Sequence, residues 1–318
     1  IPTYSMAVDR RGLGACCRVR TAVLLLLVAQ TSSIVILMRY SRTRPQARPP
    51  YLASVAVLMS ELLKLPICVG MTYASASSSA EFLALLQDEI IFQPTDTLKC
   101  AIPALAYTVQ GNLLFYALAR LEAPTYQVAY QSKTLFTALF SRCLLGRSLK
   151  PSQWVAVALL SLGTILVSDL SGTHTSVRDE HLSPIGGLVA VLTAAVLSSS
   201  SSVYFERMLK RPSSSPLAAA ASLWVRNIQL GIFAMPLALL TVLTNDFQSV
   251  SEHGWLAGFD LVVWFIVMLN GLGGLLVAAT MKYSDNIVKC FAAALAILSG
   301  TLGSNLARKL TANNAIPQ

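Results

Sequence analysis

A single lysine, Lys133, lies near the middle of an apolar stretch that runs from Pro124 to Leu145. If that stretch spans a membrane, a charge at its centre costs about 2.5–3.5 kcal/mol on insertion scales, which favours a position facing a polar cavity. Tyr126 and Tyr130 precede the lysine by seven and three residues, so all three side chains share one helix face. Two phenols and an ammonium on one face suit an anionic ligand that carries a ring.

Three more polar residues within apolar runs are candidates for the same ligand. Lys289 is a second cation of this kind, and a phosphate group would neutralise it together with Lys133. Asn227 is a candidate hydrogen-bonding partner for a base or a ribose. Asn112, in the sequence Gln110-Gly-Asn112, either reads the edge of a base or holds helices together.

A further charged pair, Glu61 and Lys64, lies three residues apart in another apolar run. This spacing puts both side chains on one helix face, where they can neutralise each other. The residue types leave two interpretations open, a satisfied structural ion pair and a role in gating or binding.

The composition identifies the class of protein that must position these residues. Of the 318 residues, 54% are hydrophobic and 12% are charged, whereas soluble domains carry about 25% charged residues. The chain is therefore expected to be an integral membrane protein that contacts the lipid bilayer. Its net charge of +9 comes from basic residues at the ends of apolar runs, as the positive-inside rule predicts, so no nucleic-acid partner is expected.

About nine apolar runs are long enough to cross a bilayer as helices, because backbone groups in lipid must be satisfied within the segment. These predicted spans are residues 19–39, 51–73, 98–119, 123–145, 152–170, 184–206, 217–243, 258–281 and 284–303. The basic N-terminus, fourth loop and sixth loop place one side in the cytosol. Two loops disagree: the first is basic but would lie outside, and the acidic second loop, with Glu81, Asp88 and Glu89, would lie inside.

An internal repeat predicts how the spans are arranged. Residues 111–120 can be aligned with residues 273–282, which carries the third and fourth spans onto the eighth and ninth. Since five spans separate the two copies, the repeats face opposite ways, as in many secondary transporters. We expect an all-α polytopic membrane protein with an inverted-repeat transporter fold: a first five-helix repeat with a cytosolic N-terminal segment (1–170), a second inverted repeat (184–303) and a polar tail (304–318).

Four motifs resemble the nucleotide-sugar transporters of the drug/metabolite transporter superfamily, and among them the CMP-sialic acid and UDP-galactose branch. They are QGNLLF at 110–115, TYQVAYQSK at 125–133, VYFER at 203–207 with LWVRNIQ at 223–229, and KYSDNIVK at 282–289. The resemblance implies ten helices in two inverted halves and a multi-pass protein of the Golgi apparatus membrane. It also implies antiport of a nucleotide sugar, of the CMP-sialic acid type, for the nucleoside monophosphate CMP.

Carried over by residue, the resemblance implies that Lys133 and Lys289 meet phosphate, and that Tyr126 and Asn227 meet base or ribose; we add Tyr130 and Asn112 as nucleotide-binding candidates. Three departures bear on the substrate. Gly111 stands where the family tends to have asparagine, Gly231 where it often has tyrosine, and Cys290 where glycine is usual.

The end of the chain is a further departure. After about Ser299 the family pattern is no longer recognisable, and a tenth span is not evident. We therefore expect nine helices with the last one missing, as in a truncated or alternatively spliced form.

Several functions stay open beside CMP-sialic acid antiport. They are a UDP-galactose/UMP exchanger, a carrier of a sugar phosphate or purine, and a truncated membrane form that does not transport. An enzyme is not expected, because no catalytic His/Glu/Asp cluster or Ser–His set lies at membrane depth. Neither a cofactor nor a metal is expected, and the oligomeric state, including a homo-oligomer, is not settled.

Overall fold

The computed structural model is helical throughout the part of the chain that it describes. It describes residues 10–43, 51–118, 120–121, 123–147, 184–211, 215–284 and 286–292, together with parts of 151–163. No strand occurs among these residues. The chain is therefore an all-α polytopic membrane protein, as its composition predicts.

The helices follow the predicted spans closely. In chain order they are α1 (Arg10–Thr43), α2 (Ala53–Ser75), α3 (Ser79–Leu86), the π-helical turn η1 (Gln87–Ile91), α4 (Pro94–Lys99), α5 (Ala101–Leu118), α6 (Ala123–Leu145), α8 (Pro184–Leu209), α9 (Pro216–Asn245), α10 (Phe247–His253) and α11 (Leu261–Tyr283). Residues 286–292 form a further helical segment. The predicted spans 152–170 and 284–303, and the tail 304–318, lie mostly or wholly outside the described residues.

Five of the described helices are long and apolar enough to cross a membrane. They are Thr21–Met38 within α1, Ala53–Ser75, Ile185–Leu209, Pro216–Asn245 and Leu261–Tyr283. Helices α5 and α6 are also long, but the polar side chains of Gln110, Asn112, Gln131 and Lys133 lower their mean hydropathy. Helix α6, which carries Tyr126, Tyr130 and Lys133, is thus less apolar than α5 and α8, as a polar interior requires.

The second loop is largely helical, which the span prediction missed. Ser78 caps α3 by accepting a hydrogen bond from the backbone N–H of Glu81 at 3.2 Å, and the Glu81 carboxylate accepts one from the N–H of Ser77 at 2.7 Å. The sequence Ser78-Ser-Ala-Glu81 has the spacing of a capping box, which is a sequence signal for a helix start.

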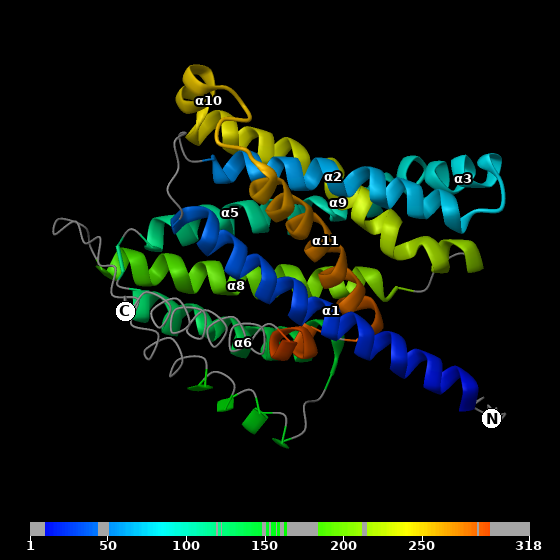
Figure 1. The fold of residues 1–318 in the computed structure, drawn as a ribbon. Coiled ribbons are helices and arrows are strands. Elements are labelled where there is room, and N and C mark those ends of the chain that lie inside the picture. The colour runs from blue at the N-terminus through cyan, green and yellow to red at the C-terminus, as the bar shows by residue number, and fades with distance from the viewer. Residues whose placement is uncertain are drawn as a thin grey trace, which may run out of the picture.

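The outer and inner surfaces of the bundle have the polarity expected of a membrane protein. Large apolar side chains such as Leu26, Leu135 and Trp264 are exposed on the outside, whereas serines and threonines are buried between helices. Helix α8 lies between α5 and α6 and packs against both, α2 packs along α9, and α11 packs on α1 and α2 (Figure 1). The buried serines of α8 allow this close packing, because their side chains are small and can bond to neighbouring backbone.

Glycines of α11 bring it close to α2. A Cβ atom at Gly271 would lie 3.1 Å from the backbone carbonyl oxygen of Ser60, whose hydroxyl donates to the carbonyl of Val267 at 3.1 Å. The glycine therefore sets the distance between the two backbones.

We expect Gly271→Leu to destabilise the protein by about 1–3 kcal/mol, because the added side chain meets backbone atoms that cannot move aside. The midpoint of thermal denaturation in detergent measures the effect. Gly70→Leu in α2 is the matched control, since nothing lies within 4 Å of its Cβ position. Equal losses in both variants would contradict the close-approach argument.

Candidate functional site

The backbone at Lys133 is fixed where α6 packs on α8. The carbonyl oxygen of Lys133 accepts hydrogen bonds from Thr137 Oγ1 and from Ser199 Oγ, both at 2.8 Å, and the two hydroxyl oxygens lie 3.2 Å apart. Both hydroxyl-bearing residues are buried. Ser199, within the run of serines in α8, therefore helps to fix the backbone at Lys133, in addition to the close helix packing that the small serine side chains allow.

The ammonium of Lys133 lies against Tyr130 one turn earlier on α6. Its Nζ donates to the Tyr130 hydroxyl at 3.3 Å and lies 5.3 Å from the ring centroid, within the range of a cation–π contact. Gln110 of α5 donates to the same hydroxyl at 3.2 Å. Since both lone pairs of that oxygen are engaged, its own hydrogen is left to donate to a ligand.

The two tyrosines of α6 form a continuous aromatic surface. The rings of Tyr126 and Tyr130 are stacked, with centroids 6.1 Å apart and planes inclined by 19°. Their other sides pack on a cluster formed by Ala117 of α5 and by Ala190 and Val191 of α8. The predicted shared face of Tyr126, Tyr130 and Lys133 is thus observed.

The second cation approaches from the end of the chain. Lys289 lies on the helical segment 286–292, drawn beside α6 in Figure 1, and is within electrostatic range of Lys133. Across the described residues, neither lysine forms an ion pair with a carboxylate. Two uncompensated cations near each other favour an anionic ligand that bridges them.

One carboxylate, Glu206 of α8, lies near Lys289, but other groups already neutralise it. The Glu206 side chain is fully buried and accepts from Lys210 Nζ at 2.7 Å, pairs with Arg147 Nη1 at 3.3 Å, and accepts the backbone N–H of Asn286 at 3.0 Å. Lys210 also donates to the carbonyl of Ser284. These contacts hold the turn before Lys289 against the end of α8.

The two predicted asparagines are not brought to this group by any contact in the described residues. Asn227 is 3% exposed, and its Nδ2 donates to the Leu223 carbonyl of its own helix at 2.8 Å. Asn112 is exposed and donates to the Thr108 carbonyl of its own helix at 3.1 Å. Their roles at a nucleotide stay predictions.

The predicted pair Glu61 and Lys64 forms an ion pair within α2, with Lys64 Nζ 2.6 Å from a carboxylate oxygen. Lys64 is 6% exposed and lies next to Gly274 of α11, where a Cβ atom would be 3.8 Å from its Nζ. The structural alternative of the sequence analysis is therefore observed, and a gating role stays untested.

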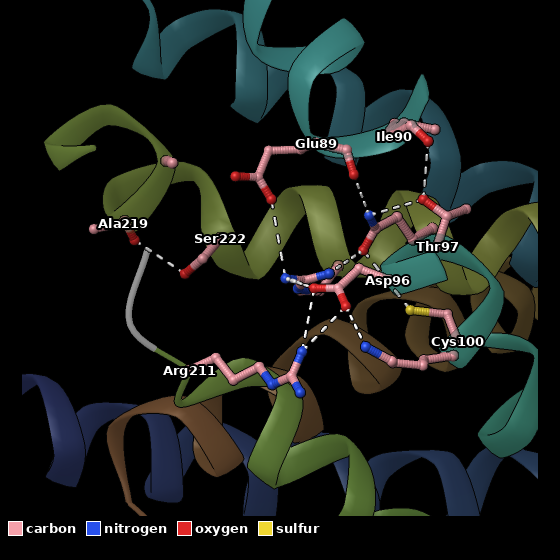
Figure 2. A network of polar contacts seen from close by, with 12 residues as sticks. Glu89, Ile90, Asp96, Thr97, Cys100, Arg211, Ala219 and Ser222 are labelled. Carbon is pink, nitrogen blue, oxygen red and sulfur yellow. Dashed lines mark hydrogen bonds and ion pairs between the residues drawn. The ribbon is translucent and has the colours of Figure 1, made fainter. Parts of the chain in front are cut away.

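An extensive polar network surrounds Asp96 of α4, which the sequence analysis did not single out (Figure 2). Arg211 contacts both carboxylate oxygens at 3.1 and 3.2 Å, and Arg226 Nη2 lies 3.4 Å from one of them. Arg226 also faces Glu89 at 3.9 Å and donates to Gln229 Oε1 at 2.8 Å.

This network accounts for the disagreement of the acidic second loop with the positive-inside rule. Glu89 and Asp96 face Arg211 of the sixth loop and Arg226 of α9, so their charges are neutralised locally. The second and sixth loops consequently lie on the same side, as the predicted topology requires. The first-loop residues 44–50 lie outside the described residues.

Tyr107 of α5 is a further site residue that the sequence analysis missed, and it lies within electrostatic range of Tyr130. It precedes Gln110 by three residues, so helical spacing could have placed it on the same face. Asp96 had no comparable signal, because its partners Arg211 and Arg226 are more than a hundred residues away in the sequence.

A helical membrane protein with two neighbouring lysines that meet no carboxylate in the described part of the chain has the features of a carrier for an anionic solute. Comparisons with known proteins agree. The family model for nucleotide-sugar transporters matches residues 16–314, and the chain belongs to this family.

Curated relatives of this chain are named as transporters of UDP-sugars. The UDP-N-acetylglucosamine transporter of Homo sapiens is 43% identical over 279 residues, which cover 87% of this chain and 84% of that protein. The UDP-galactose/UDP-N-acetylglucosamine transporter srf-3 of Caenorhabditis elegans is 39% identical over 304 residues, covering 96% and 80%. The UDP-galactose translocator of Mus musculus is 38% identical over 288 residues, covering 90% and 72%. These names agree with the expectation that the chain is not an enzyme.

The comparisons correct one expectation and weaken another. The family match extends to residue 314, so the prediction that the family pattern ends near Ser299 is wrong. The names of these relatives do not support the preference for CMP-sialic acid over a UDP-sugar.

The carboxyl group of Asp96 has a pKa below its ordinary value of 3.8, because Lys99 donates a hydrogen bond to its charged form and Arg226 and Arg211 add favourable charge, while burial opposes the shift. A lowered pKa in the folded protein means that the unfolded chain binds the proton first as the pH falls. The stabilisation is therefore complete well above that ordinary value and is lost as the pH drops below it.

We expect Asp96→Asn to lower the thermal midpoint by a constant amount between about pH 7 and about pH 5, and by a shrinking amount below about pH 4. Denaturation of both proteins in the same detergent across this range measures the difference. A difference that grows on acidification would contradict the assignment.

Proposed function

We propose that the chain is an antiporter of the Golgi apparatus membrane that exchanges a UDP-sugar for UMP. The observation that carries this proposal is the approach of Lys133 and Lys289, two cations without a carboxylate partner among the described residues, next to the stacked rings of Tyr126 and Tyr130. A diphosphate would neutralise the lysines, while the aromatic surface and the free Tyr130 hydrogen would contact the nucleoside.

The relatives favour a UDP-sugar over CMP-sialic acid as the substrate. Three of them, from a mammal, a nematode and another mammal, are named for UDP-N-acetylglucosamine, UDP-galactose or both. An exchanger of UDP-galactose for UMP was one alternative on the sequence alone. We prefer this class of substrate and include UDP-N-acetylglucosamine in it. Asn227 and Asn112 are the remaining candidates for contacts to base or ribose.

The helix contacts support two inverted halves. Helix α5 packs on α8 and α9, and its predicted repeat partner α11 packs on α1 and α2. In an inverted repeat, exchanging the third span for the eighth also exchanges the sixth and seventh spans for the first and second, so these contacts correspond. Helices α2 and α9 pack on each other and each contains an internal proline, Pro66 and Pro236.

The two lysines give a physical reason for coupled exchange. When the site is empty, reorientation would carry two uncompensated charges through a closed, poorly hydrated state, which is unfavourable. A bound phosphate lowers that cost, so the carrier reorients with either a nucleotide sugar or a monophosphate in place. The electrostatic cost of reorienting the empty carrier is then enough to couple the two substrates, and no additional gate is needed to hold the empty carrier in place.

We expect UMP to raise the thermal midpoint of the purified protein more than CMP, GMP or AMP at equal concentration. Occupancy at about one hundred times the dissociation constant stabilises the folded state by about 2.7 kcal/mol. A larger shift with CMP would return the assignment to the CMP-sialic acid branch, and binding without counterflow in proteoliposomes would indicate a form that does not transport.

We expect Lys133→Ala to weaken UMP-driven exchange about ten- to hundredfold, because a hydrogen bond to a charged group contributes about 1.5–3 kcal/mol. Uptake of labelled UDP-N-acetylglucosamine and UDP-galactose into UMP-loaded proteoliposomes measures the loss. Arg142→Gln, an exposed cation at the end of the same helix, is the control and should exchange normally. Unchanged exchange in Lys133→Ala would overturn the proposed site.

A further inference from the structure

The α5–α6 hairpin, which carries Lys133, is joined to later helices by an ion pair just outside each of its two ends. Asp96 lies five residues before α5 begins, and Arg147 lies two residues after α6 ends. Asp96 pairs with Arg211 and Arg226, and Arg147 pairs with Glu206 of α8. Both connections lead from the N-terminal part of the chain to residues beyond 184.

The Asp96 connection is anchored in a well-packed segment. Gln229 of α9 is fully buried and donates to the Glu89 carbonyl at 2.7 Å and to Thr97 Oγ1 at 3.1 Å, and Cys100 donates to its Oε1 at 3.7 Å. Figure 2 shows Glu89, Thr97 and Cys100 around Asp96. The start of α5 is thereby held against α9.

The Glu206 connection joins three segments at one carboxylate. Arg147 reaches it from the end of α6, Lys210 from its own helix, and the N–H of Asn286 from the turn that precedes Lys289. Asn286 adds a side-chain bond to Ser202 at 2.6 Å. The same carboxylate thus lies between the segments that carry the two candidate phosphate-binding lysines.

All of these pairs lie at one end of the bundle, the end that contains the second, fourth and sixth loops. At the opposite end, the described contacts include a close approach of α8 to the third loop, where a Cβ atom at Gly187 would lie 2.9 Å from Leu121, and a hydrogen bond that Ser54 of α2 donates to Asp246 after α9.

Three of the charged groups in these connections keep a partner on their own segment if the long-range contact breaks. Asp96 keeps Lys99 at 2.6 Å, Glu206 keeps Lys210 at 2.7 Å, and Arg226 keeps Gln229 at 2.8 Å. Separating these segments would therefore leave no carboxylate buried and unpaired, which is the usual cost of opening a buried ion pair. Such an arrangement suits contacts that open and close repeatedly.

We infer that Asp96 and Glu206 form a two-point ionic clamp that closes the Lys133 hairpin against α8 and α9 on the cytosolic side and opens once in each transport cycle. The statement that the clamp opens during transport rests on the proposed function. Its placement on the cytosolic side rests on the predicted topology. The alternative is that these contacts are permanent and only hold the fold together. The two roles differ in whether the segments separate during exchange.

Cross-linking separates the two roles. In Asp96→Cys/Arg211→Cys, a short bifunctional methanethiosulfonate should stop UMP-driven exchange in proteoliposomes by at least about tenfold, and a reducing agent should restore it, because the joined segments cannot part. Each single-cysteine variant treated with the same reagent controls for native cysteines. Full exchange by the cross-linked protein would overturn the clamp.

A second measurement does not depend on transport. In detergent, Asp96→Asn should raise amide hydrogen exchange several-fold in the N-terminal halves of α5 and α9, which this connection joins, and leave the α2 start and α9 end unchanged, while Asp96→Glu stays near wild type. Glu252→Gln, which removes an exposed carboxylate of α10 bonded to Gln248, is the matched control. If proteoliposomes with the wild-type protein exchange no UMP, the proposed function fails, but the amide exchange measurement still tests the clamp. Unchanged amide protection in Asp96→Asn would overturn the clamp.

Discussion

The charge of Lys133 is the constraint on which the rest of the structure depends. An ammonium at this depth needs polar neighbours, because hydrocarbon offers no solvation. The Tyr130 hydroxyl on α6 accepts from the ammonium and also from Gln110 of α5, while Ser199 of α8 donates to the backbone carbonyl of the lysine. None of the described residues places a carboxylate against this ammonium, so its charge is left without a counterion among them.

Helix α8 connects this site with the end of the bundle. Ser199 of α8 donates to the backbone carbonyl of Lys133. Glu206, in the last turns of α8, contacts Arg147, Lys210 and the backbone N–H of Asn286 in the turn before Lys289. A movement of α8 relative to the α5–α6 hairpin would therefore change the surroundings of both lysines at once. The surroundings of the two lysines are therefore linked physically to the contacts at the loop end of the bundle.

Two of the departures from the family pattern lie in helices whose packing the structure describes. Gly111 and Gly231, which depart from the residues usual in the family, have different surroundings: nothing lies within 4 Å of a Cβ at Gly111, whereas a Cβ at Gly231 would contact Leu65 of α2 at 3.8 Å. Gly111 thus opens space on α5 one residue from Gln110, while Gly231 contributes to packing between α2 and α9. Of the two, Gly111 is better placed to affect which ligand fits.

The sequence by itself determined the class of the protein, the spans that fall within the described helices and the shared face of Tyr126, Tyr130 and Lys133. These are local properties: hydropathy over about twenty residues and side-chain spacing along one helix decide them. It also identified the two lysines, because charges inside apolar runs stand out against their neighbours.

Only the tertiary structure decided which distant groups neutralise one another. The acidic second loop is consistent with the predicted topology because Arg211 and Arg226 lie beside Asp96. The sequence does not indicate that Glu206, within the motif VYFER, is surrounded by Arg147, Lys210 and the N–H of Asn286. Glu61 and Lys64 could be paired from spacing, whereas the contacts of Asp96 with Arg211 and Arg226, and of Glu206 with Arg147, span from 59 to 130 residues of sequence. Electrostatic energy depends on distance in space, and no pattern along the chain reports that distance.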